Sequence, residues 1–318
     1  MNRIPYLFID SVIGAFVSLP ECSAVAQLSD AKWENSFKDH IKNRRLFSLL
    51  MQSTESGITC LAAYYHKRRR KYLDFQQLLA FDRKFVRIKE VRLIYSTHPL
   101  ALRESTSKSV SESVFNSSVV NFIVGQFLRA GNVLHLSNND VDCQGKILAA
   151  VHKQIYFSQL ELRYSGESSE EFLVDQLENS AHLTSVDLRG TWNQGTIKHL
   201  LKFVIKNNEQ SVQVDLSGSD ILLDQTSLRE FVKSWQSKAI KTADFTVKTE
   251  LTEGQIGAIL SRFSERRFLI CQKEEKRAIE AFTNEEDGTI HIMTFECGCG
   301  AKAPNSFGCY LKKFIPDH

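Results

Sequence analysis

The chain has 318 residues, of which 42% are hydrophobic and 24% charged. This composition excludes disordered, collagen-like and low-complexity polymers, and it suffices for one large core or two smaller ones. The net charge of +3 is unevenly distributed, because residues 1–103 carry 17 Lys/Arg and 9 Asp/Glu whereas the remainder carries 23 and 28. No apolar stretch reaches the roughly 20 residues of a membrane-spanning helix, and the seven scattered cysteines favour a reducing compartment. We therefore expect a cytoplasmic or nuclear protein; a secretory signal is the disfavoured alternative, since Pro5 and Asp10 interrupt its apolar region.

The first predicted elements are two short amphipathic helices. Pro5 suits the first turn of a helix, and apolar residues at positions 5, 8, 9, 12, 13 and 16 form one stripe along it. Pro20 ends this segment, and the apolar positions up to Trp33 predict a second helix over residues 25–33.

This arrangement resembles an F-box, which has an initial apolar-Pro pair, an amphipathic helix, a Leu-Pro pair and apolar positions leading to a Trp. The resemblance implies that residues 1–45 bind the Skp-class adaptor of a cullin ubiquitin ligase. The alternative is that the same residues pack on the following elements as an end cap. The residues that the resemblance places at the adaptor or within the module are Ile4, Pro5, Phe8, Val12, Ile13, Phe16, Leu19, Pro20, Val25, Leu28 and Trp33.

Residues 46–130 are predicted to contain a helical linker and a degenerate first repeat. Leu46, Leu49 and Leu50 have helical spacing, residues 91–95 alternate as in a strand, and residues 105–118 hold seven Ser and predict a loop. The basic run at residues 66–71 fits a solvated helix face. Its alternatives are a nuclear address or, together with the basic residues at 83–92, a nucleic-acid contact, which we disfavour because no aromatic stacking platform accompanies the run.

The second half of the chain repeats one pattern with a period of 26 to 29 residues. Five segments alternate as x-apolar-x-apolar-x, at residues 133–137, 159–163, 185–189, 213–217 and 242–246, and each predicts a short strand. Helical periodicity follows or precedes them, over residues 120–127, 170–179, 197–204, 228–235 and 256–263. One such unit cannot bury its own apolar faces, so the units must stack with their strands in a parallel sheet. The alternative is an ordinary doubly wound α/β domain.

The repeat resembles the leucine-rich repeat, because residues 134–141 fit L-x-L-x-x-N-x-L. Asn139 stands where the family's Asn caps backbone groups in the turn. Later units carry Ser165, Thr191 and Ser219 there, which can make weaker versions of that bond, and the last carries Lys248, which cannot. An F-box-like segment followed by such repeats resembles the large, divergent F-box families of nematodes, in which the repeats hold the substrate.

A column of polar residues is predicted on the concave face, between the two apolar positions of each strand. Four consecutive strands place a carboxylate there, and these charges repel unless arginines or a cationic ligand offset them. The column therefore predicts a groove for a basic segment; the alternative is a solvated sheet face. The candidate substrate-binding residues, including the flanking arginines, are His135, Glu161, Arg163, Asp187, Arg189, Asp215 and Asp244.

The carboxyl-terminal residues predict a cap of strands at 267–271, 278–283 and 289–295, the last two a hairpin. Cys297, Cys299 and Cys309 with His291 are of the types that bind zinc, but the C-x-C spacing chelates poorly and we expect free thiols. The sequence lacks the phosphate-loop, dinucleotide, nucleophile-elbow and H-E-x-x-H motifs.

The sequence thus predicts an α/β protein in four parts. These are an F-box-like helical module over residues 1–45, a linker and degenerate repeat over 46–130, a leucine-rich-repeat-like horseshoe over 131–265 and a β cap over 266–318. We expect a non-catalytic substrate-recognition subunit of a cullin-type ubiquitin ligase, with a Skp-class adaptor and a protein substrate as partners and with no cofactor or metal. The alternative is an interaction scaffold without a ligase. Neither a membrane nor nucleic acid is an expected partner.

Overall fold

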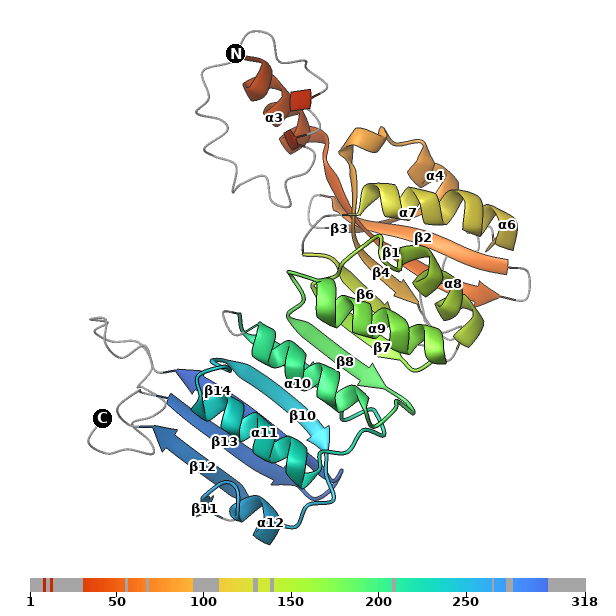
Figure 1. Ribbon diagram of the computed structural model, residues 1–318. Coiled ribbons are helices and arrows are strands. Elements are labelled where there is room, and N and C mark those ends of the chain that lie inside the picture. Colours follow the sequence, from red (N-terminus) through yellow and green to blue (C-terminus); the bar gives the residue numbers. More distant parts are fainter. Residues whose placement is uncertain are drawn as a thin grey trace. The chain divides into compact units, whose positions relative to one another are not determined.

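The computed structural model describes residues 8–9, 12–13, 31–54, 57–66, 69–93, 109–127, 131–137, 140–207, 210–264, 266–272 and 277–296. They form an α/β protein with mixed, open sheets (Figure 1). The chain divides into two compact units, residues 1–183 (unit 1) and 184–318 (unit 2). Each described helix is too short or too polar to cross a lipid bilayer.

The amino-terminal helical segment of unit 1 includes α3 (Ala31–Asn43), which buries Phe37 and His40. Ile9 and Ile13 are also fully buried. Arg44, directly after α3, donates a 2.6 Å hydrogen bond to the carbonyl oxygen of Ile13. The predicted second helix over residues 25–33 overlaps α3 only in its first turn, and residues 14–30 lie outside the described part of the chain.

The sheet of unit 1 has the strand order β3-β2-β1-β4-β6-β7, and β5 pairs with β2. Pairing is antiparallel among β1, β2 and β3 and parallel from β1 through β4 and β6 to β7. The strands are β1 (Arg45–Thr54), β2 (Gly57–His66), β3 (Arg69–Asp74), β4 (Val86–Leu93), β5 (Ser109–Val110), β6 (Val133–Leu136) and β7 (Gln159–Arg163).

Three predictions for residues 46–118 are wrong. Leu46, Leu49 and Leu50 belong to strand β1, not to a helix. The basic run at 66–71 spans the ends of β2 and β3, so its described residues lie on a sheet rather than on a helix face. Residues 112–118, predicted as loop, form α6 (Glu112–Val114) and most of the π-helical turn η3 (Phe115–Val119).

The remaining helical elements of unit 1 share one face of the sheet. The edge-on ring pair of Phe75 in α4 (Phe75–Leu79) and Phe122 in α7 (Val120–Gln126), with centroids 5.7 Å apart, places both helices on that face. Also on it are α8 (Val141–Val151) and α9 (Glu167–Asn179), as Figure 1 shows, while η2 (Arg83–Phe85) leads into β4.

The predicted alternation of the repeat strands is confirmed in β6 and β7. Leu134, Leu136, Leu160 and Leu162 are buried, and the residues between them are only half-buried. The buried leucines face the helices, so the intervening residues lie on the opposite side of the sheet, which we call the outer face. Strand β4 pairs in parallel with β6 and stands where the degenerate first repeat was predicted.

Unit 2 has the strand order β11-β12-β13-β14-β10-β9-β8. Strands β8 (Ser185–Arg189), β9 (Val212–Asp215) and β10 (Ala243–Lys248) are parallel. Strands β11 (Arg262–Ser264), β12 (Arg267–Gln272), β13 (Arg277–Asn284) and β14 (Thr289–Glu296) continue the sheet antiparallel to one another, and β14 is antiparallel to β10. The predicted strands of the carboxyl-terminal cap are therefore confirmed.

Helices α10 (Thr196–Lys206) and α11 (Gln225–Gln236) lie on one face of the unit 2 sheet (Figure 1). They bury the stripes that the 3.6-residue period predicts, Leu200 and Val204 in α10 and Phe231 and Trp235 in α11. The last predicted helix is wrong in length, because α12 (Glu253–Gly257) ends early and residue 263 belongs to strand β11.

In each repeat, the small polar residue in the turn after the strand was expected to bond nearby backbone groups. Ser219 does so. The Ser219 hydroxyl donates to the carbonyl oxygen of Leu216 at 2.8 Å and accepts from the Ile221 amide at 3.3 Å. In the last unit, Thr249 rather than Lys248 bonds backbone groups. Its hydroxyl accepts from the Leu251 amide at 3.1 Å but donates to the carbonyl oxygen of Leu223, 26 residues back in the chain, at 2.9 Å. Asn139, on which the leucine-rich-repeat resemblance rested most, lies outside the described residues.

Candidate functional site

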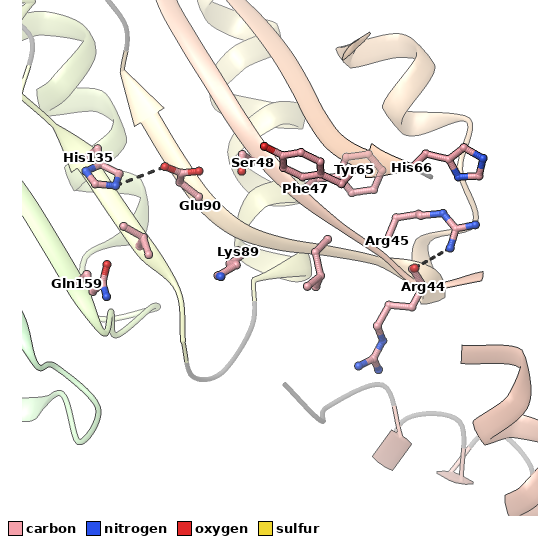
Figure 2. A pocket seen from close by; sticks show the side chains of 12 residues that line it. Arg44, Arg45, Phe47, Ser48, Tyr65, His66, Lys89, Glu90, His135 and Gln159 are labelled. Carbon is pink, nitrogen blue, oxygen red and sulfur yellow. Dashed lines mark hydrogen bonds and ion pairs between the residues drawn. The ribbon is translucent and has the colours of Figure 1, made fainter. Parts of the chain in front are cut away.

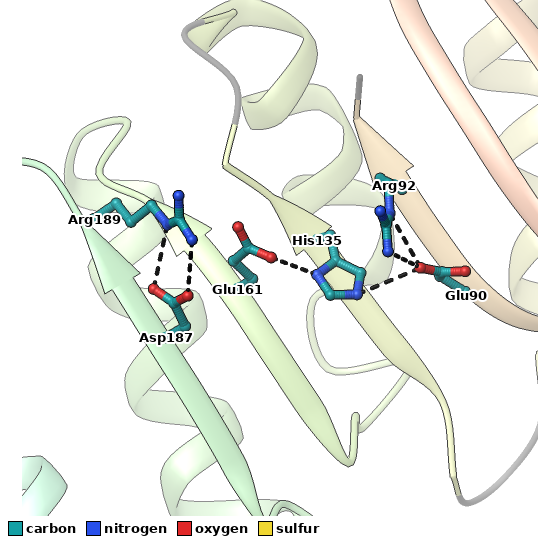
Figure 3. A network of polar contacts seen from close by, with 6 residues as sticks. All are labelled: Glu90, Arg92, His135, Glu161, Asp187 and Arg189. Carbon is teal, nitrogen blue, oxygen red and sulfur yellow. Dashed lines mark hydrogen bonds and ion pairs between the residues drawn. The ribbon is translucent and has the colours of Figure 1, made fainter. Parts of the chain in front are cut away.

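A row of charged side chains crosses the outer face of unit 1 (Figure 3). Arg92 Nη2 lies 2.6 Å from Glu90 Oε1, and His135 Nε2 lies 3.4 Å from the same oxygen. The other ring nitrogen of His135, Nδ1, forms a 2.7 Å hydrogen bond with Glu161 Oε2. His135 on β6 therefore connects two carboxylates, Glu90 on β4 and Glu161 on β7, the strands on either side of it.

Strand register explains why these residues meet. Arg92 of β4 pairs with His135 of β6, which pairs with Glu161 of β7, so three polar residues stand side by side on the same face. The β1–β4 pairing shifts register between Phe47 and Ser48 and leaves Lys89 as the extra residue of a bulge. Because of the bulge, both Lys89 and Glu90 lie on the outer face.

The Glu90 carboxylate is stabilised in its charged form. Its partial burial favours protonation, but hydrogen bonds from Ser48 and Arg92 and the charges of Arg92 and His135 outweigh burial and hold the pKa of Glu90 below its ordinary value. Glu90 is thus an anion that its neighbours already neutralise.

A pocket of about 760 Å³ opens beside this row (Figure 2). Its lining is mixed, with basic, aromatic and apolar side chains from β1, β2 and β4 and the first residues of β6 and β7. The guanidinium of Arg45 is held at its rim by hydrogen bonds to the carbonyl oxygens of Arg44 and Lys42, at 2.8 and 3.0 Å. The lining residues are Arg44, Arg45, Leu46, Phe47, Ser48, Tyr65, His66, Lys89, Glu90, Val133, His135 and Gln159.

Unit 2 carries the carboxylates of its own strands on its outer face, each with a partner. Asp187 accepts two hydrogen bonds from Arg189, at 3.0 and 3.3 Å, as Figure 3 shows. Asp215 Oδ1 accepts from the hydroxyl and the amide of Ser217, at 2.7 and 2.9 Å. Asp244 forms a hydrogen bond with His291 of β14.

The predicted column has a register error at its last member. Asp187 pairs with Asp215 as expected, but Asp215 pairs with Thr246, and Asp244 pairs with Gln213. Asp244 is therefore two residues out of line, because Ala243 and Phe245 pair with Val212 and Val214, two residues earlier in β9 than the spacing indicated. Asp244 and Asp215 are thus not directly opposite each other, as the predicted column required.

The partners found for these carboxylates change what the face can do. Arg189 offsets the charge of Asp187, which is one of the two ways of relieving the repulsion that the sequence left open, and His135 forms a hydrogen bond with Glu161. Arg163 lies half-buried on β7, next in the alternation after Glu161. Because arginines neutralise Glu90 and Asp187 within the fold, the charge at these two positions does not require a basic ligand.

The predicted adaptor residues are described only in part. Phe8 is 55% exposed and Ile13 is fully buried, whereas Val12 and Trp33 are half-buried. The others, Ile4, Pro5, Phe16, Leu19, Pro20, Val25 and Leu28, lie outside the described residues. Among the described residues of this predicted set, Phe8 is thus the one whose side chain is largely exposed to solvent.

Residue types that bind metals are not clustered in the described part of the chain. Within the described ranges, no three His, Cys, Asp or Glu side chains come together as a metal site. His291 forms its hydrogen bond with Asp244 and an edge-on ring contact with Phe282, at 4.7 Å between centroids. Cys297, Cys299 and Cys309 lie outside the described residues, so the expectation that they are free thiols stays a prediction.

Sequence reasoning missed Lys89 and Tyr65, two pocket residues that lie at the surface. A bulge cannot be read from the sequence of β4. Residues 60–65 form an unbroken apolar and aromatic run without alternation, so no local pattern places Tyr65 on an exposed side of β2. No family model matches the chain, and no curated protein or solved structure is significantly similar to it.

Proposed function

We propose that the protein is a non-catalytic substrate-recognition subunit of a cullin-type ubiquitin ligase. In this proposal the amino-terminal segment binds a Skp-class adaptor, and the outer face of the parallel strands binds a protein substrate. The observation that carries it is the repeated strand-helix unit, whose described helices pack on one face of the strands while polar side chains line the other. Repeat proteins of this organisation bind partners along such surfaces.

Exposure at the amino terminus supports the adaptor part of the proposal. Phe8 is 55% exposed although Ile9, its neighbour, is fully buried. A large aromatic ring held at the surface by a buried neighbour fits an anchor for a partner's apolar pocket. Ile41 of α3 is similarly exposed, at 56%.

A specific contact favours the second candidate, an interaction scaffold without a ligase. The hydrogen bond from Arg44 to the carbonyl oxygen of Ile13 and the full burial of Ile9 and Ile13 show that part of this segment packs within the chain. That packing suits an end cap for the unit 1 sheet.

The two candidates separate in one binding experiment. The full-length chain is mixed with a purified Skp-class adaptor, and the complex is measured by calorimetry beside Phe8→Ala and the control Val141→Ala, which truncates a side chain that is 54% exposed on α8. We expect one adaptor per chain, binding weakened about tenfold or more in Phe8→Ala as for an anchor residue, and unchanged binding in Val141→Ala. A folded chain that does not bind the adaptor contradicts the ligase proposal and leaves the scaffold.

A further inference from the structure

The outer face of β2 and β3 presents aromatic and basic side chains together. Tyr65 is 71% exposed at the end of β2. It pairs directly with Arg70 on β3, and Arg70 in turn lies over the ring of Tyr72, 5.4 Å from its centroid. Residues paired across strands, and residues two apart on one strand, share a face. The three side chains therefore form one surface, which we call the tyrosine-arginine surface.

This surface continues into the pocket of unit 1. Tyr65 lines the pocket together with Arg45 and Lys89 (Figure 2). Arg45 is fixed by its two hydrogen bonds to backbone carbonyl oxygens, and Lys89 is exposed at the bulge in β4. The nearby acid, Glu90, is balanced by Arg92, which leaves the cations of the pocket able to act on a ligand.

The combination of an exposed ring with separated cations selects the chemistry of the ligand. A phosphate group is bound through charge by Arg and Lys, and Tyr65 could add only a hydrogen bond from its hydroxyl, so the exposed ring itself contributes nothing to phosphate recognition. A flat base stacks on an exposed aromatic ring, and the phosphates that follow it along a strand need cations at intervals. A duplex hides its bases from such a ring, so the ligand must be single-stranded.

We infer that the tyrosine-arginine surface binds single-stranded nucleic acid, with a base stacked on Tyr65 and phosphates held by Arg70, Arg45 and Lys89. The prediction of a solvated helix face for residues 66–71 depends on the lack of an aromatic platform beside the basic run. The β2–β3 pairing supplies that platform, since it brings Tyr65 and Tyr72 to the same face as Arg70. This surface is separate from the proposed adaptor contacts, but it adjoins the proposed substrate contacts on the outer face, because His135 lines the same pocket.

Fluorescence anisotropy of the full-length chain tests the inference. The probes are labelled 15-nucleotide oligo-U and oligo-dT, and the variants are Tyr65→Ala, Tyr65→Phe, Lys89→Ala and the control Lys233→Ala, which removes an exposed lysine of α11. We expect Tyr65→Ala to weaken binding about 5- to 140-fold, which is the stacking contribution of about 1–3 kcal/mol converted at 1.4 kcal/mol per tenfold. Tyr65→Phe keeps the ring and should bind like the wild type.

The salt dependence identifies the phosphate contacts. Lys89→Ala should lower the slope of log affinity against log salt by about 0.7, the value for one lost contact to a single strand, and Lys233→Ala should leave it unchanged. The oligo-U and oligo-dT arms show whether the surface prefers RNA or DNA, and either preference supports the inference.

Three results would overturn it. The first is the absence of binding to both oligonucleotides at low salt. The second is equal binding by wild type and Tyr65→Ala, which would indicate attraction to any polyanion. The third is tighter binding of a phosphoserine peptide of matched charge with no dependence on the Tyr65 ring, which would assign the surface to a phosphorylated protein.

Discussion

Arg277 should be one of the largest single contributors to the stability of unit 2. Its side chain is 3% exposed on β13, yet its guanidinium donates to the carbonyl oxygens of Trp235 and Ile240, at 3.0 and 2.6 Å, where α11 ends. It also lies 5.1 Å from the centroid of the Trp235 ring. The cation therefore gives two carbonyl oxygens near the carboxyl terminus of α11 a buried, charged donor, in addition to the Lys238 amide that also donates to the Trp235 carbonyl.

The effect of Arg277→Met follows from these bonds. Each charge-assisted hydrogen bond contributes about 1.5–3 kcal/mol, and relief of a buried charge returns part of that sum, so we expect the free energy of unfolding to fall by about 2–4 kcal/mol. At a denaturant slope of about 2 kcal/mol/M, the urea midpoint should drop by about 1–2 M. The transition is followed by tryptophan fluorescence, to which Trp33, Trp192 and Trp235 contribute, and by circular dichroism.

The matched control is Arg262→Met, which removes an exposed arginine paired with Glu253 at 2.8 Å in the same unit. An exposed ion pair of this kind contributes at most about 1 kcal/mol, so its midpoint should change little. A loss below about 1 kcal/mol in Arg277→Met, or equal losses in both variants, would refute the assignment of these carbonyl bonds to unit 2 stability.

Three further predictions concern buried thiols, a turn hydroxyl and an acid. Burial raises the pKa of Cys60 and of Cys143 to about 12, and Cys143 adds to the effect on Cys60. Iodoacetamide at pH 8 should therefore alkylate both thiols only when urea unfolds the chain, which peptide mass spectrometry measures. Since the unfolded chain ionises these thiols near pH 9, the free energy of unfolding should fall above that pH by up to about 1.4 kcal/mol per pH unit for each thiol. Ser219→Ala should cost about 1–2 kcal/mol in urea unfolding, because it leaves the buried Leu216 carbonyl and Ile221 amide without that partner; no loss would contradict the turn bond. Because the native pKa of Glu90 is lowered, its contribution to stability is present above the ordinary pKa of 4.5 and is lost as the pH falls through the native pKa. The free energy of unfolding, measured from pH 6 to pH 3, should therefore fall less in Glu90→Gln than in the wild type.

Strands buried on one face were predictable, because their period-two alternation survives in the sequence. This holds for β6, β7 and β8. The hairpin of β13 and β14 was predictable for another reason, its two apolar runs around Asp287-Gly288, since β13 is buried on both faces over its first five residues. Strand β1 was missed because Leu49, Leu50 and Met51 are all buried, so the strand is covered on both faces there and its apolar residues show no alternation.

The candidate site was predictable in composition and less so in arrangement. The alternation of apolar and polar residues is enough to place His135, Glu161 and Asp187 on the outer face. The partners of these residues depend on register, as Asp244 shows, and on the bulge at Lys89, and neither is encoded by a local pattern. The tyrosine-arginine surface needed the β2–β3 pairing, because Tyr65 and Arg70, five positions apart, would face different sides of a helix and are directly paired on this sheet.

Hydrogen–deuterium exchange of the full-length chain, with and without a saturating Skp-class adaptor, tests the central claim most directly. The ligase proposal predicts slower exchange in peptides covering residues 4–33 and unchanged exchange in the strands of unit 2. Identical exchange in every peptide, or protection confined to residues 184–296, would contradict it.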